Sequence, residues 1–202
     1  MVASLLEADP DLILFQEFTP HWQHHFKTAL WDQYPHRIED PLEGPFGICL
    51  ASRLPLEQAA ILPDSTGLPV AAAVVTVGGR RIAVLGVHPM PPMRPSGHAM
   101  WQEAFTDWPG RLRALHAEHA VLAGDLNSTP FSLTFQQLCR DAGLRDSSQG
   151  FGLHNTWFAL TPPFGLPLDH ILTSPKLTVL SHMTGPDAGS DHRWVRAKLA
   201  VP

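Results

Sequence analysis

Short apolar runs that end at a turn or at a polar residue recur along this chain, and such runs are typical of buried strands. Between two of them, Gly78-Gly79 predicts a tight hairpin, because both glycines accept positive φ. From this pattern we expect strands at residues 11–16, 46–52, 69–77, 80–88, 121–124, 155–158, 168–173, 177–183 and 195–201.

Helical spacing of apolar residues separates several of these runs. We expect Thr129-Pro130 to open one helix, with threonine as the cap and proline at the first helical position, and this helix should end near Ala142. Residues 89–97 are rich in proline and should form a loop, and Pro109 should break the helix that follows. The other helices are expected at residues 2–8, 21–31 and 97–119.

Strands in runs and hairpins, with helices between some of them, predict one α/β domain over residues 1–202. We expect two packed sheets, a β-sandwich, with helices on both outer faces. A chain of 202 residues is long enough for one sizeable core and short for two.

The charge balance limits the range of partners. The formal net charge is −5, which argues against tight binding to bulk nucleic acid. The two cysteines lack metal-ligand spacing, and Cys49 lies in an apolar run as a small hydrophobic residue. No signal peptide or membrane span is visible, so we expect a soluble chain that is cytoplasmic or of unassigned location.

Acidic and histidine side chains fall at or near the ends of the apolar elements, where a rigid scaffold can present them to one cleft. They are Glu17, His88, Asp125, Asn127, Asp169, His170, Asp191 and His192. Converging carboxylates repel each other by about 4 kcal/mol per pair at 4 Å and an effective dielectric of 20. A hard cation such as Mg²⁺ or Mn²⁺ relieves that repulsion, which predicts metal-dependent hydrolysis of a phosphate ester.

The block from Gly124 to Pro130 (GDLNSTP) resembles the GDFNxxP signature of the endonuclease/exonuclease/phosphatase superfamily. This superfamily includes pancreatic-type deoxyribonuclease, abasic-site endonucleases, inositol polyphosphate phosphatases and sphingomyelinases. Four further blocks follow the family's order, and the loop after His88 is most similar to bacterial members, whose longer forms can carry membrane segments ahead of this domain. The four blocks are Phe15-Gln16-Glu17, Gly47 to Pro55, Leu168 to Ile171 and Gly189 to His192.

The resemblance implies a four-layer, deoxyribonuclease-like fold and a role for each matching residue. Glu17 and Asp191 would bind the metal, and Asp125 would stand at the metal and activate water. Asn127 would position the water and the phosphate. Asp169 would hold His192 in one tautomer so that the histidine stabilises the phosphoryl group, and His88 would bind a phosphate oxygen.

Other polar and aromatic residues are given structural interpretations. His170 should point to the face of its strand opposite to Asp169. Trp101, Trp108 and Trp157 either stack on a substrate or pack in the core. Solvent-facing helical positions are expected for His21, His24, His25, His116 and His119.

The chain departs from the family pattern at its start. The family begins with a strand that carries an asparagine at the metal, and here the first residues already belong to the helix that follows it. We therefore expect an N-terminally shortened domain, either a fragment or a naturally short member. The strand next to the missing one would have an unpaired edge, which predicts a homodimer.

Two functions remain open. The first is a phosphodiesterase, nuclease or phosphatase acting on nucleic acid, a phosphorylated small molecule or a lipid head group. The second is a catalytically silent member of the fold that acts as a binding module.

Overall fold

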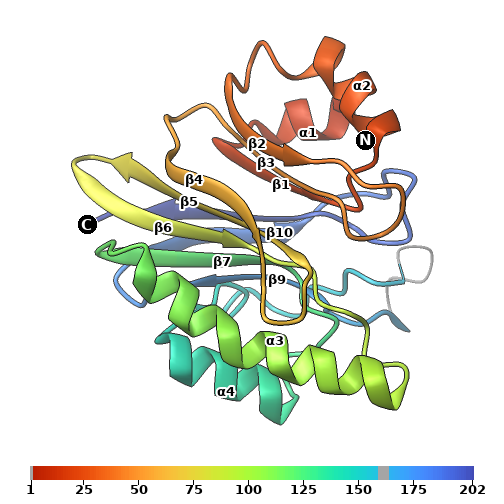
Figure 1. Ribbon diagram of the computed structural model, residues 1–202. Coiled ribbons are helices and arrows are strands. Elements are labelled where there is room, and N and C mark those ends of the chain that lie inside the picture. The colour runs from red at the N-terminus through yellow and green to blue at the C-terminus, as the bar shows by residue number, and fades with distance from the viewer. Residues whose placement is uncertain (1, 159–163) are drawn as a thin grey trace.

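The computed structural model describes residues 2–158 and 164–202, and two layers of strands form its centre (Figure 1). The larger layer is a six-stranded sheet with the order β4-β5-β6-β7-β9-β8. Its strands are β4 (Glu57–Pro63), β5 (Pro69–Val77), β6 (Arg80–Gly86), β7 (His119–Asp125), β8 (Arg145–Asp146) and β9 (Asp169–Thr173).

The second layer holds a three-stranded sheet with the order β1-β3-β2 and the antiparallel pair β10-β11. Its strands are β1 (Leu12–Gln16), β2 (His36–Asp40), β3 (Ile48–Ser52), β10 (Thr178–Thr184) and β11 (Val195–Ala200). Side chains of both layers, among them Leu50 and Val84, form one apolar cluster between them. Leu14 of β1 and Leu199 of β11 both pack against this cluster, so both parts of the second layer cover the large sheet.

Helices cover the outer faces and complete four layers, as predicted (Figure 1). Helices α1 (Val2–Ala8) and α2 (Pro20–Ala29) lie over the three-stranded sheet, and an aromatic cluster that includes Phe15, Phe26 and Trp31 joins them to it. Helices α3 (Pro95–Ala114) and α4 (Leu133–Ala142) lie over the six-stranded sheet. Among the described helices, none is long and apolar enough to cross a membrane.

The apolar runs predicted most of the strands, and the predicted hairpin forms, with positive φ at Gly78 and Gly79. The pattern missed β2, β4 and β8. Each of these is an edge strand. The sequences of β2 and β8 carry mostly polar residues, and the apolar run of β4 is only four residues long. The strand predicted at residues 155–158 is wrong, because Trp157 makes only isolated bridges to Leu166 and His192.

Three predicted helix positions are also wrong. Helix α3 begins at Pro95, inside the predicted loop, and continues through Pro109, where the buried neighbours Trp108 and Leu112 hold it in the core. Packing thus offsets the cost of proline, about 3 kcal/mol in a helix interior. The cap of α4 is Ser132, whose hydroxyl accepts a hydrogen bond from the backbone of Phe135, and not Thr129.

Among the histidines expected on helices, His21, His24, His25 and His116 are exposed as predicted. His119 is the exception, because it is buried at the start of β7. Trp101 and Trp108 pack in the core, and Cys49 is fully buried, so that burial raises the pKa of its thiol.

One end of the sandwich, which we call the site end, is where β1, β6 and β7 finish and β9 and β11 begin. The Gln16 side chain joins the two layers there. Its Nε2 donates to the Val87 carbonyl at 2.9 Å, and its Oε1 accepts from the Asp125 amide at 3.0 Å. A Cβ at Gly124 would lie 1.9 Å from the Val87 carbonyl oxygen, so these backbones approach too closely for any other residue.

The Gln16→Met substitution should lower the free energy of unfolding by about 2–4 kcal/mol, because it leaves a buried carbonyl and a buried amide without partners at about 1–3 kcal/mol each. Urea unfolding followed by circular dichroism measures this. The Gln102→Met control alters an exposed glutamine on α3 and should change stability by less than about 0.5 kcal/mol. Equal effects of the two substitutions would contradict the role of Gln16.

A second prediction concerns His182 on β10, whose Nδ1 lies 2.9 Å from the Ser147 hydroxyl. Burial, and then the charge of His154, lower the pKa of His182 to about 4. The unfolded chain, with a pKa near 6.5, binds more protons between about pH 6.5 and pH 4, so stability should fall as pH falls through that window. In His182→Gln the loss between pH 7 and pH 5 should be smaller by about 1–2 kcal/mol.

Urea unfolding at the two pH values tests this expectation. The exposed His21 provides the control, since His21→Gln should leave the loss of stability between pH 7 and pH 5 unchanged. A wild-type chain that is equally stable at pH 7 and pH 5 would contradict the assignment of a buried, neutral His182.

Candidate active site

The structure brings together at the site end the side chains that the sequence placed at the ends of separate elements. Asp125 ends β7, Asp169 begins β9, and His192 lies just before β11. One ligand atom from each of these three lies within 4.8 Å of the others. His88, which follows β6, lies beside them, with its Nε2 3.8 Å from Asp125 Oδ2. Residues from both layers of the sandwich therefore meet at one place.

Asp169 and His192 form the best-defined pair in this group. His192 Nδ1 lies 2.8 Å from Asp169 Oδ2, and His192 Nε2 lies 3.8 Å from Asp125 Oδ2. Burial disfavours the charged imidazole, but the hydrogen bond to Asp169 and the charges of Asp169, Asp125 and Asp191 raise the pKa of His192 to about 9. The two neighbouring acids therefore favour the charged form of His192.

Crowded negative charge is the main electrostatic feature of the site. Burial, and then the charge of Asp169, raise the pKa of Asp125 to about 7. Burial, and then the charge of Asp191, also raise the pKa of Glu17, and His192 and Asp169 act on it as well. These mutual effects place Glu17 and Asp191 beside the three clustered residues. The cluster thus has carboxylate oxygens in excess, as a hard divalent cation requires.

The closest three side chains are not the set assigned to the metal from the sequence, which was Glu17, Asp125 and Asp191. Asp125 belongs to both sets. Asp169 and His192 take the other two places in the tight cluster, where they bind each other.

Two residues of the site have the backbone conformation that favours glycine. Glu17 has φ 52° and Asn127 has φ 48°. Asparagine accepts this region readily, whereas the same conformation costs glutamate on the order of 1–3 kcal/mol. Such strain is found mostly at functional sites. The Asn127 amide donates to Asp125 Oδ1 at 2.7 Å, and its Nδ2 donates to the Pro89 carbonyl at 3.2 Å, so Asn127 fixes Asp125 and the loop after His88 together.

His88 and Asp191 are each held by an aromatic neighbour. His88 is buried with its ring 5.6 Å from the ring of Phe46, and burial is the first cause of its lowered pKa. The indole Nε1 of Trp157 donates to Asp191 Oδ2 at 3.3 Å. Trp157 therefore lies at the site, and stacking on a substrate stays a prediction.

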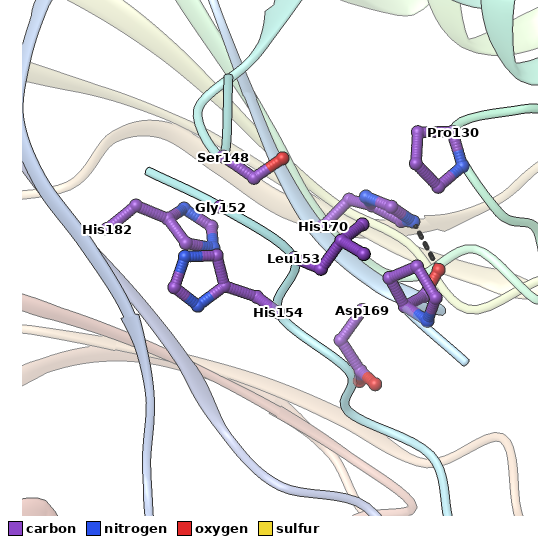
Figure 2. A pocket seen from close by; sticks show the side chains of 9 residues that line it. Pro130, Ser148, Gly152, Leu153, His154, Asp169, His170 and His182 are labelled. Carbon is purple, nitrogen blue, oxygen red and sulfur yellow. Dashed lines mark hydrogen bonds between the residues drawn. The ribbon is translucent and has the colours of Figure 1, made fainter. Parts of the chain in front are cut away.

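His170 points away from Asp169, as the alternation along a strand predicted (Figure 2). Its Nδ1 faces Asp146 Oδ2 at 3.2 Å, while its Nε2 faces the carbonyl oxygens of Ser128 at 2.9 Å and Pro167 at 3.0 Å. Both ring nitrogens of His170 thus face oxygen atoms of neighbouring segments.

The ion pair of His170 and Asp146 is buried behind the site. Burial raises the pKa of Asp146, but the hydrogen bond and charge of His170 outweigh it and hold that pKa below its ordinary value. The pair ties the loop of Asp125 and Asn127 to the segment before Asp169. Sequence reasoning missed this contribution of Asp146, since it lies in a two-residue edge strand with no recognisable pattern.

Comparison with known proteins agrees with this geometry. The family model of the endonuclease/exonuclease/phosphatase family matches residues 1–192. An inositol phosphosphingolipids phospholipase C of Saccharomyces cerevisiae is 30% identical over 164 residues, which cover 69% of this chain and 34% of the yeast protein. The chain thus spans about a third of the length of this relative.

Solved structures share the fold at lower identity. A 3′-5′ exonuclease (NExo) of Neisseria meningitidis is 22% identical, with a TM-score of 0.74 over 98% of this chain and 93% of that chain. TDP2 of D. rerio, in complex with a single-strand DNA product, is 18% identical, with a TM-score of 0.79 over 98% and 89%. Sphingomyelinase C of Streptomyces griseocarneus is 19% identical, with a TM-score of 0.62 over 98% and 87%.

The family match covers nearly the whole chain, and four of the five sequence blocks that suggested it supply the acidic and histidine residues at one end of a four-layer sandwich. This chain belongs to the endonuclease/exonuclease/phosphatase family.

Proposed function

We propose that this chain is a divalent-metal-dependent phosphoesterase that cleaves its substrate with an activated water. The observation that carries the proposal is the cluster of Asp125, Asp169 and His192, with Glu17 and Asp191 close enough to perturb its charges. A buried group of acids with one histidine dyad fits phosphate-ester hydrolysis better than a purely structural role, because its mutual repulsion destabilises the fold.

The donor set fits Mg²⁺ or Mn²⁺. Glu17, Asp125 and Asp191 would hold the ion through carboxylate oxygens, the ligands that these cations prefer. The raised pKa of Asp125 reflects burial and the negative charge of Asp169, which is the condition that a bound cation relieves. When bound, the ion supplies positive charge to phosphoryl oxygens and makes a coordinated water more acidic.

The protein's own residues supply orientation and proton transfer. Asp125, held by the Asn127 amide, orients the attacking water and accepts its proton. Asp169 fixes the imidazole of His192, which donates to the phosphoryl oxygen on which negative charge develops. His88, kept neutral by burial, binds a second phosphate oxygen through its N–H.

Substitutions at the cluster should abolish turnover. We expect hydrolysis of bis(p-nitrophenyl) phosphate to require Mn²⁺ or Mg²⁺. Asp125→Asn and His192→Gln should each lower kcat by at least about 100-fold, the range for loss of a general base or a charge-stabilising donor. The matched control is His154→Gln. His154 is half-buried and contacts His182 outside the cluster, so this variant should retain activity. Absorbance at 405 nm measures the product.

Wild-type protein that binds Mn²⁺ and hydrolyses none of a panel of DNA, RNA, inositol phosphates and phospholipids would overturn the proposal. That result would favour the alternative function, a silent member of the fold that acts as a binding module.

We also propose that the chain associates with a second copy of itself through the unpaired edges of β1 and β11. Within the described part of the chain, β1 pairs with β3 alone and β11 with β10 alone, although both strands cover the same large sheet. Helix α1 connects them through side chains, since Trp194 donates to the Ser4 hydroxyl and Arg196 to the Ala8 carbonyl. The facing edges of β1 and β11 are therefore available to an extended strand.

Strand pairing at this edge predicts a concentration-dependent dimer. Light scattering after size exclusion should give a mass that rises from one chain toward two between about 1 and 100 µM, a range typical of weak specific association. Leu14→Pro, which removes a backbone donor from the free edge of β1, should keep the chain monomeric, whereas Val179→Pro on β10 should not affect assembly. A monomer throughout the range would contradict the proposal.

A further inference from the structure

Large apolar side chains are exposed on three loops of the site end. They are Met93 at 86% exposed, Phe131 at 70%, Leu133 at 79% and Leu153 at 75%. Met93 follows β6, Phe131 and Leu133 follow β7, and Leu153 lies between β8 and β9. We call these four residues the apolar rim.

The three loops lie next to one another around the acidic cluster. The Asn127 side chain joins the loop after β7 to Pro89, in the loop of Met93. Pro130 and Leu153 line the same small cavity of about 20 Å³, beside Asp169 (Figure 2). The segment that carries Phe131 and Leu133 is thus joined on one side to the loop of Met93 and on the other to Leu153, whereas scattered single exposed residues would need no explanation.

Apolar side chains continue from the rim to the reacting groups. Leu166 and Phe158 are also exposed, and Leu166 pairs with Trp157, which contacts Asp191 and bridges to His192. A substrate held at the cluster would thus have an apolar wall beside its phosphate.

The opposite end of the sandwich has a different surface. Ion pairs link neighbouring elements there, and they join Arg53 to Asp9, Arg80 to Glu118 and Arg81 to Glu57. These ion pairs lie at the left side of Figure 1, where the β5–β6 turn is, away from the four residues of the rim.

The charge of the site end selects among apolar partners. The recorded ion pairs of Asp125 and Asp169 are with His88 and His192, and no arginine or lysine enters them. The net charge of −5 disfavours the many cationic contacts that a nucleic acid or an anionic membrane requires. An apolar surface around an acidic site instead complements an uncharged interface whose head groups contain a phosphodiester.

We propose that the apolar rim docks on a zwitterionic lipid surface and that the substrate is a phosphodiester head group in that surface. The substrate assignment rests on the proposed phosphoesterase function, whereas the docking does not. Insertion of the four rim side chains among the lipids would place the acidic cluster at head-group depth, because the rim surrounds the cluster.

Sedimentation with phosphatidylcholine vesicles tests the docking without any catalysis. We expect the wild-type chain to sediment with the vesicles. The double variant Phe131→Ser and Leu133→Ser, which we call the rim variant, should bind at least roughly tenfold more weakly, since it removes two large apolar side chains from the interface. Leu180→Ser, at an exposed leucine on β10 outside the rim, is the matched control and should bind as wild type does. Inclusion of an anionic lipid should weaken binding.

Activity on two substrates then separates this proposal from the proposed function. The rim variant should hydrolyse bis(p-nitrophenyl) phosphate as wild type does but lose at least roughly tenfold on phosphatidylcholine vesicles. Vesicle binding without hydrolysis of either substrate would sink the phosphoesterase function and leave the docking intact.

Three results would overturn the docking. The first is a wild-type chain that does not sediment with phosphatidylcholine. The second is a rim variant that loses binding to single-stranded DNA while vesicle binding is unchanged, which would assign the rim to nucleic acid. The third is a lipid-free dimer that the rim variant abolishes, which would assign it to a second copy of the chain.

Discussion

The repulsion among buried carboxylates at the site end is the constraint on which the rest of this structure depends. Asp125, Asp169, Glu17 and Asp191 come from four separate segments. Burial raises the pKa of Glu17 and of Asp125, and the charge of Asp169 raises both further. Such a group persists only when the surrounding backbone is held firmly enough to resist its separation. The rigid strand ends hold these acids in place. Gly124 and the side chain of Gln16 support them, because they keep the two layers close together at the site end.

Further supports lie on the far side of the reacting groups. The buried side chains of His170 and Asp146 contact each other, and they connect the loop of Asp125 to the segment of Asp169 from behind. In front, the indole of Trp157 holds Asp191. The clustered side chains are thus oriented by partners on both sides, which is the arrangement expected of a preorganised site and not of a solvated acidic patch.

The surface around the site has the opposite character to its centre. Acidic groups lie at the strand ends, and large apolar side chains lie on the loops that extend beyond them. Strand ends are rigid and suit groups that must hold a fixed geometry, whereas loops vary freely and determine what the site can approach. A common catalytic scaffold in this family can therefore serve different substrates through its loops, and here the loops favour an apolar environment.

The sequence by itself determined the central strands, the four-layer sandwich and the residues of the site. Central strands are buried on both faces and so leave continuous apolar runs, and Asp125, Asp169 and His192 could be recognised because each follows or interrupts such a run. The edge strands β2, β4 and β8 left no such signal, since one side of each faces solvent. The course of α3 through Pro109 was also decided by packing, because the buried Trp108 and Leu112 outweigh the local preference of proline. Only the tertiary structure could assign Gln16, Asp146 and the apolar rim, because their roles come from contacts between segments that are distant along the chain, and no local pattern encodes such contacts.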